Sequence, residues 1–429
     1  MSKPQSGALT AGQPSARLLD LTRLVSRSGL QQTGLDRVEA KYLERFLQEP
    51  LPLFSLVRTV AGGGPWRHPV FTLLDRQGSA ALADRLLGIT PFGRPDLRAI
   101  LRRRARPAQR AAYADLRRLG LEHSDARGLA PMLERHLPKG TAWVNCSHLN
   151  METRVVFEAM TSIDGGRSSV FIHDVIPLDY PAYTMPHAAE SFSKTLRHAS
   201  EYADLIICNS DHTRQTATRH FEIAGRVPPM ITAHLGVDLP VPDPSAIPSG
   251  IDTGKPYFVV LGTIEPRKNH TLLLDIWEHF TATLPDEQIP KLLIIGKRGW
   301  MNKEVFARLD TSPLIGRYLH EMPNLDDSAV AALITGAQAL LMPSVVEGFG
   351  LPPAEALALG TPALVNDLPV YREVLGNNPV YLPVTDMYSW AEKILELARA
   401  DRKERKAAVG EASWLPTWQE HFNLVLKVT

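Results

Sequence analysis

The stretch that decides the fold is Val346–Glu355, VEGFGLPPAE, which directly follows the apolar segment ALLMPS at 339–344. A short apolar run, a glycine-rich turn and then adjacent prolines before a new apolar pattern predict the end of a buried strand and the start of a helix. The start of a helix presents free backbone N–H groups and the positive end of the helix dipole. Because parallel α/β sheets bind ligands at the carboxyl ends of their strands, we predict a ligand site here.

The side chains of this stretch indicate the kind of ligand. Glu347 lies in the turn and Glu355 lies about one turn into the helix, so both carboxylates can face one crevice. Carboxylate oxygens accept hydrogen bonds from sugar hydroxyls, and the free backbone N–H groups suit a diphosphate. The alternative is that Glu355 is a surface residue and the prolines only begin the helix. The predicted ligand contacts are Glu347, Gly348, Phe349, Gly350, Leu351 and Glu355.

A second glycine turn, LGTIEPRKNH at 261–270, follows the apolar run YFVVL at 257–261 and also opens a helix. Arg267 and Lys268 are placed where a departing diphosphate needs positive charge, since a guanidinium fork and an ammonium both bind phosphate oxygens. The alternative is an ordinary loop with solvated cations. The predicted contacts are Gly262, Thr263, Arg267, Lys268 and Gly296, the last of which ends the next apolar run.

Outward from these turns, short apolar runs alternate with segments of helical spacing, which predicts a parallel sheet with helices on both faces. The expected strands of the second half are 257–261, 292–295, 318–322, 339–342 and 363–366, and the expected helices are 270–284, 303–309, 328–335, 353–359 and 370–375. The first half repeats the pattern less cleanly, with strands expected at 18–24, 53–57, 70–74, 143–146, 170–173, 205–208 and 230–234. The predicted fold class is α/β, with two Rossmann-like domains whose parallel sheets face a central cleft.

Composition places the domain boundaries. Residues 239–255 are rich in Pro, Ser, Gly and Asp and lack apolar periodicity, which is typical of a linker. The linker separates a first domain at 1–238 from a second domain at 256–410. An Arg-rich helical insertion is expected at about 95–135. The final segment, 411–429, is expected to form an amphipathic helix that packs back on the first domain.

Charge is distributed unevenly along the 429 residues. Residues 1–240 hold 30 Lys and Arg against 23 Asp and Glu, whereas the remainder holds 17 against 23. The densest cluster, Arg98–Arg118, predicts contact with an anionic membrane surface or a phosphorylated acceptor, and the alternative is a solvated helix face. Nucleic acid is not an expected partner, because no aromatic interleaving or recognition motif accompanies the charge.

Other features bear on the compartment. Cys146 and Cys208 are expected to be buried thiols in a reducing cytoplasm. The N-terminus lacks a signal-like apolar stretch, and no run of roughly 18 apolar residues occurs. We therefore expect a cytoplasmic protein, peripheral on the inner membrane face if the Arg cluster binds lipid. Cys/His spacing for zinc is lacking, and no metal site is predicted.

On these strings the sequence resembles the retaining GT-B glycosyltransferases of family four, including mannosyltransferase-like members of bacterial polysaccharide synthesis. The resemblance covers the second domain over roughly 256–382 and rests on the spacing of Glu347 and Glu355. It implies that Glu347 holds the transferred sugar, that the backbone of 349–351 cradles sugar and phosphate, and that Glu355 binds the ribose. It also implies that Lys268 binds the diphosphate. Thr263 stands where many members carry Arg, and Arg267 takes that role in members with a Pro-Arg-Lys-Asn string.

The first domain resembles the family more weakly. Thr33–Glu39, TGLDRVE, is similar to the glycine turn whose backbone approaches the phosphates, which assigns Gly34. FIHDVIP at 171–177 is similar to the strand end that bears a His near the reacting sugar, which assigns His173; its alternative is a hydrogen-bonded core histidine. Asp174 either assists the acceptor hydroxyl or caps the next loop. The strings at 209–210 and 234–238 also match family landmarks and are interpreted as positioning elements.

The resemblance implies front-face attack by an acceptor hydroxyl while the nucleotide diphosphate leaves. Arg267, Lys268 and helix N-termini would then stabilise the leaving group, and no cofactor or metal is expected. The expected donor is a nucleotide-diphosphate sugar, with GDP-mannose favoured, and the expected acceptor is a saccharide or lipid-linked saccharide. The alternatives are a GT-B nucleotide-sugar epimerase, an NAD(P)-dependent enzyme, which lacks its GxGxxG motif here, and a non-catalytic scaffold of a polysaccharide-assembly complex.

Overall fold

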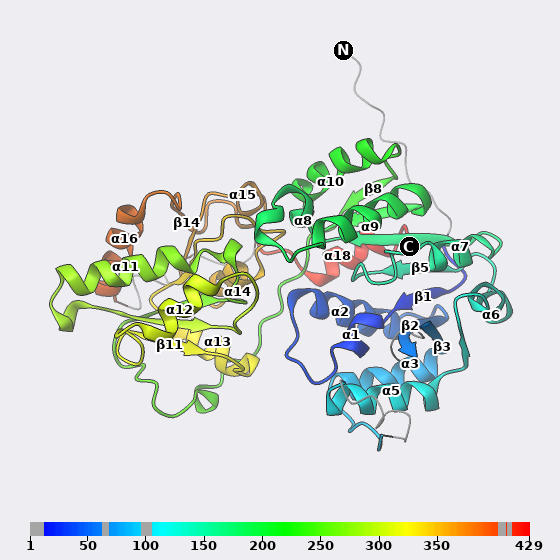
Figure 1. Cartoon of the computed structure of the whole chain (residues 1–429), viewed down its shortest axis with the longest axis horizontal. Coiled ribbons are helices and arrows are strands. Elements are labelled where there is room, and N and C mark those ends of the chain that lie inside the picture. The colour runs from blue at the N-terminus through cyan, green and yellow to red at the C-terminus, as the bar shows by residue number, and fades with distance from the viewer. Residues whose placement is uncertain (1–12, 62–67, 96–104, 402–408, 410–413) are drawn as a thin grey trace, which may run out of the picture.

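The computed structural model describes residues 13–61, 68–95, 105–401, 409 and 414–429, which form two α/β domains lying side by side (Figure 1). Sheet A of the first domain and sheet B of the second each consist of strands from one half of the chain. The two Rossmann-like domains expected from the sequence are confirmed, and the arrangement is that of the GT-B fold.

Sheet A has eight strands in the order β4-β3-β2-β1-β5-β6-β7-β8. The strands are β1 Arg17–Asp20, β2 Leu53–Ala61, β3 His68–Leu74, β4 Glu122–Ser124, β5 Ala142–Asn145, β6 Arg167–Ile172, β7 Leu205–Cys208 and β8 Met230–Thr232. The sheet is parallel except at one edge, where β3 runs antiparallel to both β2 and β4. This edge differs from the wholly parallel sheet that was expected. Only a few residues separate β2 from β3, and so short a connection cannot hold the crossover that a parallel pair requires.

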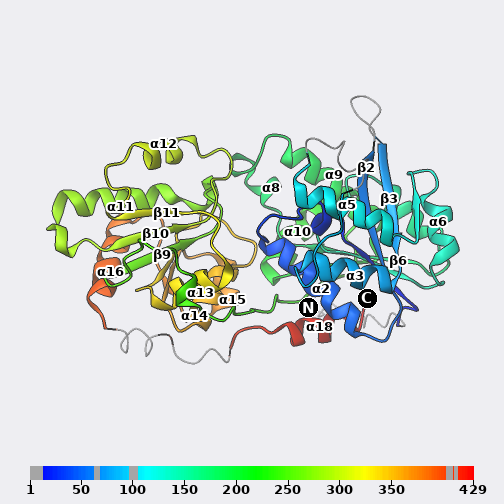
Figure 2. The same cartoon turned by 90° about the horizontal axis from the view of Figure 1, so that it is seen from below.

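Helices cover both faces of sheet A (Figures 1 and 2). They are α1 Thr22–Ser26, α2 Gly34–Gln48, α3 Arg76–Leu86, α5 Pro107–Leu119, α6 Leu129–His136, α7 Val155–Thr161, α8 Ile176–Asp179, α9 Ala188–Tyr202 and α10 Asp211–Ala224, with a 3-10 turn η2 at Pro181–Tyr183. The strand expected at 18–24 is wrong beyond Asp20. The Asp20 carboxylate accepts from the Thr22 N–H, which turns the chain into α1.

Sheet B has six strands in the order β11-β10-β9-β12-β13-β14, all of them parallel. The strands are β9 Tyr257–Leu261, β10 Lys291–Ile295, β11 Leu319–Met322, β12 Leu340–Met342, β13 Ala363–Val365 and β14 Val380–Tyr381. The helices are α11 His270–Thr283, α12 Lys303–Thr311, α13 Asp327–Gly336, α14 Leu351–Ala358, α15 Pro369–Leu375 and α16 Met387–Arg399, with 3-10 turns η4 at Pro266–Lys268 and η5 at Asp286–Gln288. The strands and helices expected in this half match these bounds to within a few residues, because the central strands are buried and largely apolar. The short strand β14 and the helix α16 were not expected.

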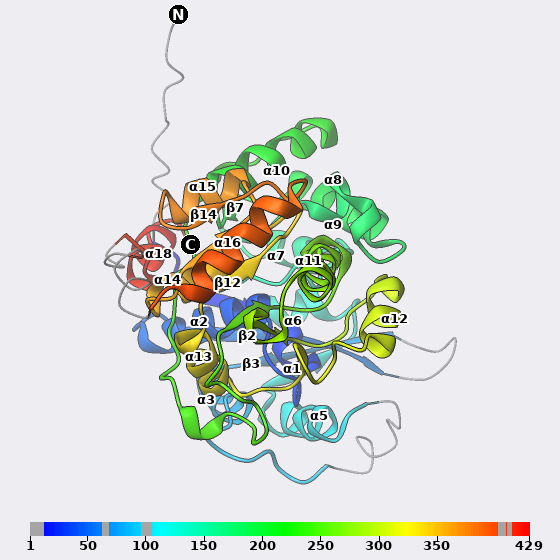
Figure 3. The ribbon, with the colours of Figure 1, turned by 90° about the vertical axis from the view of Figure 1, so that its left-hand side faces the viewer.

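Two segments pass between the domains. Residues 239–255 leave the first domain after β8 and contain the 3-10 turn η3 Pro244–Ala246, where the Asp243 N–H donates to the Ser328 carbonyl beside α13. The last helix, α18 Trp418–Val425, returns to the first domain, where Tyr42 Oη lies 2.9 Å from His421 Nε2. Figures 1 and 2 show α18 beside the first-domain helix α2, apart from the helices of sheet B, and Figure 3 views the two domains one in front of the other.

Both cysteines are free thiols in the core. Within the described ranges, no helix combines the length and the apolar character that a membrane span requires. Part of the Arg cluster, including Arg98 and 102–104, lies outside the described residues. The described members Arg106 and Arg118 bind within their own domain. Arg106 donates to the Ser26 and Ser28 carbonyls, and Arg118 pairs with Asp115.

Candidate functional site

The two glycine turns of the second domain meet at the carboxyl edge of sheet B. Glu347, in the loop after β12, receives Arg267 Nη1 on one carboxylate oxygen and Lys268 Nζ on the other, each at 2.5 Å. Both cations come from η4, after β9, and the Val345 N–H donates to the Arg267 carbonyl at 2.8 Å, which fixes one turn against the other. The structure therefore brings together three residues that the sequence predicted as neighbours.

Burial and pairing set the charge state of this cluster. Burial by itself raises the pKa of Glu347, but Arg267 and Lys268 outweigh it and lower that pKa to about 2. Burial lowers the pKa of Lys268, and Glu347 opposes this effect. Burial also acts to lower the pKa of Arg267, but nearby carboxylates raise it above its ordinary value. Glu347 and Arg267 are thus held as ions inside a largely buried site.

A second acidic residue, Glu265, belongs to the cluster although no role was predicted for it from the sequence. It is 2% exposed, and its carboxylate lies 2.6 Å from Arg267 Nε. Arg267 therefore forms ion pairs with both Glu265 and Glu347. The second oxygen of Glu265 has no hydrogen-bond partner, and burial raises the pKa of this carboxyl. The sequence signal that could have indicated this role is the position of Glu265 two residues before Arg267 in the same turn.

The glycines of these turns allow close backbone packing. A Cβ on Gly296 would lie 2.0 Å from the Gly262 carbonyl oxygen, and Gly296 has φ +151°, so no side chain fits there. Gly262 packs against the Lys268 side chain, whose Cε would lie 3.4 Å from a Cβ. The Thr263 side chain packs against Gly299, where a Cβ would lie 2.5 Å from Thr263 Cγ2. Gly350, with φ +109°, precedes α14 and packs against the Tyr371 ring.

Glu355 has a different partner from Glu347. It lies on α14, and its carboxylate pairs with Arg37 Nη1 of the first-domain helix α2 at 2.9 Å. Arg37 also pairs with Asp327 at 3.1 Å, so α2 is bridged to α13 and α14 across the domain boundary. Burial raises the pKa of Glu355 to about 7, and Arg37 only partly opposes this. Glu355, which was predicted to bind the ribose, is therefore paired with Arg37, for which no role was predicted.

The first domain meets the Glu347 loop at the end of β6. A Cβ on Gly348 would lie 2.7 Å from the His173 carbonyl oxygen and 3.2 Å from an Asp174 carboxylate oxygen. Thr213 Oγ1 lies 3.3 Å from both the His173 and Gly348 carbonyl oxygens. Asp174 Oδ1 accepts from the Ile176 N–H at 3.0 Å, which is the loop-capping role left open for it. His173, Asp174 and Glu347 are thereby brought to one place.

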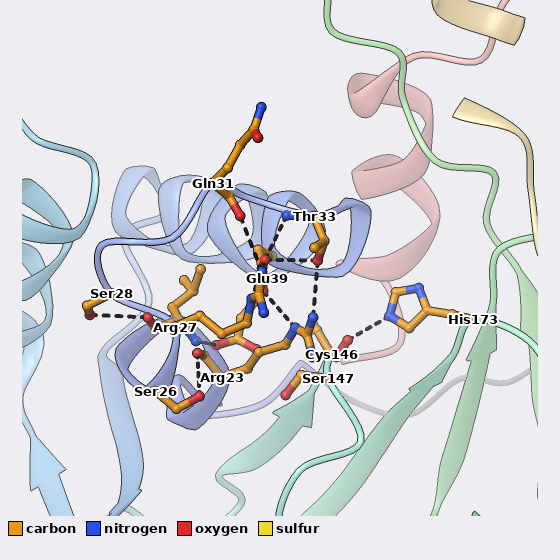
Figure 4. A network of polar contacts seen from close by, with 12 residues as sticks. Arg23, Ser26, Arg27, Ser28, Gln31, Thr33, Glu39, Cys146, Ser147 and His173 are labelled. Atoms are coloured by element: carbon orange, nitrogen blue, oxygen red, sulfur yellow. Dashed lines mark hydrogen bonds and ion pairs between the residues drawn. The ribbon is translucent and has the colours of Figure 1, made fainter. Parts of the chain in front are cut away.

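The His173 ring is buried and neutral. It is 5% exposed, its Nε2 lies 2.7 Å from the Cys146 carbonyl oxygen, and it stacks on Phe171. Burial, aided by His148, lowers its pKa to about 3. Figure 4 shows His173 at one end of a polar network that includes Cys146, Arg23 and Glu39. The neutral imidazole donates Nε2–H to Cys146, which leaves Nδ1 as an acceptor.

The remaining predicted contacts line the same boundary. Gly34 begins α2, and a Cβ there would lie 3.7 Å from Leu351 Cδ1 of the second domain. Phe349 is buried, with its ring 6.2 Å from the His234 ring. Gly34, Phe349 and Leu351 therefore face the domain boundary from opposite sides.

A further contact across the boundary was not predicted. Glu373 on α15 accepts from the Asp211 and His212 N–H groups at the start of α10, at 2.6 and 2.9 Å. The same carboxylate lies 2.8 Å from His234 Nε2. The landmarks at 209–210 and 234–238 are next to this contact: Ser210 caps α10, and Asn209 Nδ2 donates to the His173 carbonyl. Gly236 packs directly on Trp418 of α18.

Comparisons with known proteins show what parts of this chain resemble. Residues 245–413 match the profile of the glycosyl transferases group 1. The chain is 28% identical over 291 residues to the serotype-specific mannosyltransferase WbdA of Escherichia coli, a match covering 63% of this chain and 35% of that relative. It is 30% identical over 143 residues to the O-antigen chain mannosyltransferase RfbU of Salmonella typhimurium, covering 32% of this chain and 37% of that one. The chain thus spans about a third of the length of these curated relatives.

Solved structures support the fold. The crystal structure of Anabaena HepE in complex with UDP and glucose superposes with a TM-score of 0.61 at 14% identity, covering 96% of this chain and 98% of that one. The sucrose-phosphate synthase from Thermosynechococcus elongatus gives a TM-score of 0.51 at 17% identity over 66% of this chain and 71% of that one. At these identities the likeness concerns the fold alone.

Proposed function

We propose that the chain, whose residues 245–413 match the profile of the glycosyl transferases group 1, is a retaining glycosyltransferase acting on a nucleotide-diphosphate sugar. The observation that carries the proposal is the buried cluster of Glu347 with Arg267 and Lys268, both at 2.5 Å. A paired cluster of this kind supplies cations for a diphosphate and a carboxylate for sugar hydroxyls within one small volume.

In this proposal, donor binding exchanges partners within the cluster. The diphosphate takes the N–H donors of Arg267 and Lys268, which frees Glu347 to accept from hydroxyls of the sugar. In this exchange Arg267 and Lys268 leave one anion for another, and Glu347 replaces its two cations with hydroxyl donors, so each buried group keeps a hydrogen-bond partner. As the bond from the sugar to the diphosphate breaks, negative charge grows on the leaving group beside cations that are already in place.

The bonds balance in a front-face displacement. The acceptor hydroxyl oxygen forms a bond to the sugar's anomeric carbon on the face from which the diphosphate oxygen departs with the bonding electron pair. The hydroxyl proton passes to that departing phosphate oxygen. No protein nucleophile is required, and catalysis is positioning plus charge stabilisation. We propose that the reaction needs no metal ion, since Arg267 and Lys268 supply the positive charge.

We propose mannose as the transferred sugar and GDP-mannose as the donor. The support is that WbdA and RfbU are mannosyltransferases and that the Pro-Arg-Lys-Asn string at 266–269 resembles such members. The proposed acceptor is a saccharide or a lipid-linked saccharide. A peripheral position on a membrane would depend on lipid binding by the Arg cluster. Two members of that cluster, Arg106 and Arg118, bind groups within their own domain.

Donor hydrolysis is the test. The purified chain would be incubated without metal with a panel of GDP-, UDP-, ADP- and dTDP-sugars, and the released nucleotide diphosphate would be measured. We expect release from one donor, lost in both Glu347→Ala and Lys268→Ala. Turnover with no donor, together with no nucleotide-diphosphate binding by calorimetry, would exclude the transferase and favour a non-catalytic scaffold. Interconversion of the donor sugar without release would indicate an epimerase.

A further inference from the structure

Aromatic side chains from both domains meet at one side of the domain boundary. Tyr180 follows α8, Tyr183 ends η2, and Trp300 lies in the loop between β10 and α12. The rings of Tyr180 and Tyr183 are stacked, with centroids 6.3 Å apart and an interplanar angle of 20°. The Trp300 indole N–H donates to the Tyr183 carbonyl oxygen at 3.4 Å, which joins the two domains. We call Tyr180, Tyr183 and Trp300 the aromatic rim.

The aromatic rim presents its rings to solvent. Tyr180 is 41% exposed and Trp300 is 38% exposed. Large aromatic surface in water is unfavourable, and exposed apolar residues that gather in one place mark binding sites more often than scattered ones do. Met185 and Met301, which flank the rim in sequence, are also about half exposed. The rim is thus a continuous apolar feature rather than a single exposed residue.

Both halves of the rim are connected directly to the proposed reaction site. From Asp174, which packs against Gly348 beside Glu347, the chain runs through α8 to Tyr180 and Tyr183. From Gly296, which packs on Gly262 beside Lys268, the chain runs to Trp300. Figure 2 shows α8 and α12 towards the same edge of the molecule and α18 towards the opposite one. In both domains, therefore, only a few residues of chain separate the rim from the reaction site, and the rim lies on the α12 side of the boundary.

The charges around the rim select among ligands. Asp179, next to Tyr180, pairs with Arg219 at 3.3 Å and with His220 at 2.7 Å. Arg298, two residues before Trp300, pairs with Glu321 at 2.8 Å and with Asp310 at 2.7 Å. These charges are already compensated within their own domains, so they do not favour a phosphate or an anionic lipid. Exposed rings between compensated charges suit a neutral ligand that has both an apolar face and hydroxyl groups.

We propose that Tyr180, Tyr183 and Trp300 form the acceptor subsite and hold a neutral saccharide, whose C–H face packs on the rings while its hydroxyls stay hydrated or hydrogen-bonded. This inference rests on the proposed function and adds to it the residues that recognise the acceptor. Aromatic rings are suited to this task, because they provide a large rigid contact area with few rotatable bonds.

The subsite is complete only when the domains are as close as in this structure. Trp300 belongs to the second domain and the tyrosines belong to the first, and the contact from Trp300 to the Tyr183 carbonyl depends on that closeness. A saccharide that contacts both halves binds the closed arrangement more tightly than an open one. Acceptor binding therefore favours closure, which excludes water from the donor.

The test separates acceptor recognition from donor chemistry. Trp300→Ala and Tyr180→Ala would be compared with the unaltered protein, with Trp300→Phe as the conservative variant and Tyr388→Ala as the matched control. Tyr388 is 66% exposed on α16, in the helical layer of sheet B. Mannotriose is the acceptor probe, and the donor is the sugar nucleotide that the unaltered protein hydrolyses. Thermal unfolding checks that each variant is folded.

We expect the acceptor KM to rise about tenfold or more in Trp300→Ala and Tyr180→Ala, in line with the loss of one aromatic contact. Donor KM and acceptor-independent donor hydrolysis should stay unchanged, and Trp300→Phe should retain most of the affinity. An unchanged acceptor KM, no mannotriose binding by the unaltered protein, or rim variants that lose only binding to anionic phosphatidylglycerol vesicles would each overturn the subsite. Donor hydrolysis absent from the unaltered protein would instead refute the proposed function.

Discussion

The carboxyl edges of the two sheets bury ionisable groups in opposite ways. At the edge of sheet B, Glu347 is buried as an anion with its pKa lowered to about 2, because two cations outweigh the effect of burial. At the edge of sheet A, burial raises the pKa of Glu39 to about 8 and lowers the pKa of His173 to about 3, so both groups are uncharged at neutral pH. The edge of sheet B, the charged edge, buries paired ions, whereas the edge of sheet A, the neutral edge, buries Glu39 and His173 in uncharged form. Ion pairs also lie near the neutral edge, where Arg23 and Arg27 pair with Asp36.

Under the proposed function, this difference divides the work of the transfer reaction between the two domains. A leaving diphosphate needs fixed opposite charge, which Arg267 and Lys268 provide at the edge of sheet B. A hydroxyl-bearing partner needs neutral donors and acceptors, and unpaired charges would only add a cost of desolvation. The charged half is therefore suited to the donor and the neutral half to the acceptor. The predictions that follow set the two halves against each other.

The largest expected effect is on turnover. Lys268→Ala removes a cation that lies 2.5 Å from Glu347, and we expect donor hydrolysis to fall by roughly 10²–10³-fold in kcat/KM, as for loss of one preorganised charge contact. Glu39→Gln, at the neutral edge, should leave kcat/KM within about threefold because it removes no charge. Equal losses in the two variants would mean that the halves are not divided by charge.

The next effect is on stability at the charged edge. Glu347→Gln leaves Arg267 and Lys268 without their shared anion, and we expect the free energy of unfolding at pH 7 to fall by roughly 3 kcal/mol. Glu347 stabilises the fold above its unfolded pKa of 4.5, and the contribution is lost as the pH falls towards 2. Denaturant unfolding at pH 7 and pH 3 would measure this, and a variant effect that does not shrink at pH 3 would contradict it.

The same substitution at the neutral edge should have the opposite sign. The folded protein retains the Glu39 proton up to about pH 8, whereas the unfolded chain releases it near 4.5, so stability is lost as the pH rises through this range. Glu39→Gln removes that loss and should stabilise the protein by about 1–3 kcal/mol at pH 8 and very little at pH 4. Thermal unfolding at both pH values tests this, and destabilisation at pH 8 would show that Glu39 is an ion in the fold.

The smallest effect concerns the contact that joins the two halves. Glu373→Gln replaces the carboxylate that caps α10 and contacts His234 with a neutral amide. We expect the free energy of unfolding to fall by about 0.5–1 kcal/mol. The change should be measurable as a small fall in the unfolding temperature with unaltered donor hydrolysis. A fall in turnover comparable to that of Lys268→Ala would show that this contact controls the reaction and does more than hold the domains together.

Sequence reasoning predicted the charged edge far better than the neutral one. Glu347, Arg267 and Lys268 lie in glycine turns directly after buried strands, where local pattern and topology place them together. The strands of sheet B are parallel and mostly apolar, so the bounds of β9 to β13 follow from composition, whereas the two-residue β14 and the helix α16 were missed. Sheet A has an antiparallel edge and polar residues inside its strands, and the pattern there was correspondingly weaker: β4 was missed and β1 was overextended.

The cross-domain partners could not have been predicted. Arg37 and Glu355 are separated by 318 residues, and nothing local to either one indicates the other. Glu373 caps a helix of the other domain, whereas caps are read from sequence only within a few residues. Glu39 gave no signal of its charge state, because a carboxyl two residues after Arg37 on an amphipathic helix is usually solvated. These features depend on how the two domains meet.

The return of α18 to the first domain has a consequence for folding during synthesis. Arg17 Nη2 in β1 donates to the Thr429 carbonyl oxygen at 3.1 Å, across 412 positions of the chain. His421, buried against Tyr42, likewise fills part of the first domain's interior. The first domain therefore completes its interior only after all of sheet B and α18 have been translated. Until then it leaves exposed the surface that α18 covers, so we expect a chaperone that binds this nascent chain to bind the first domain.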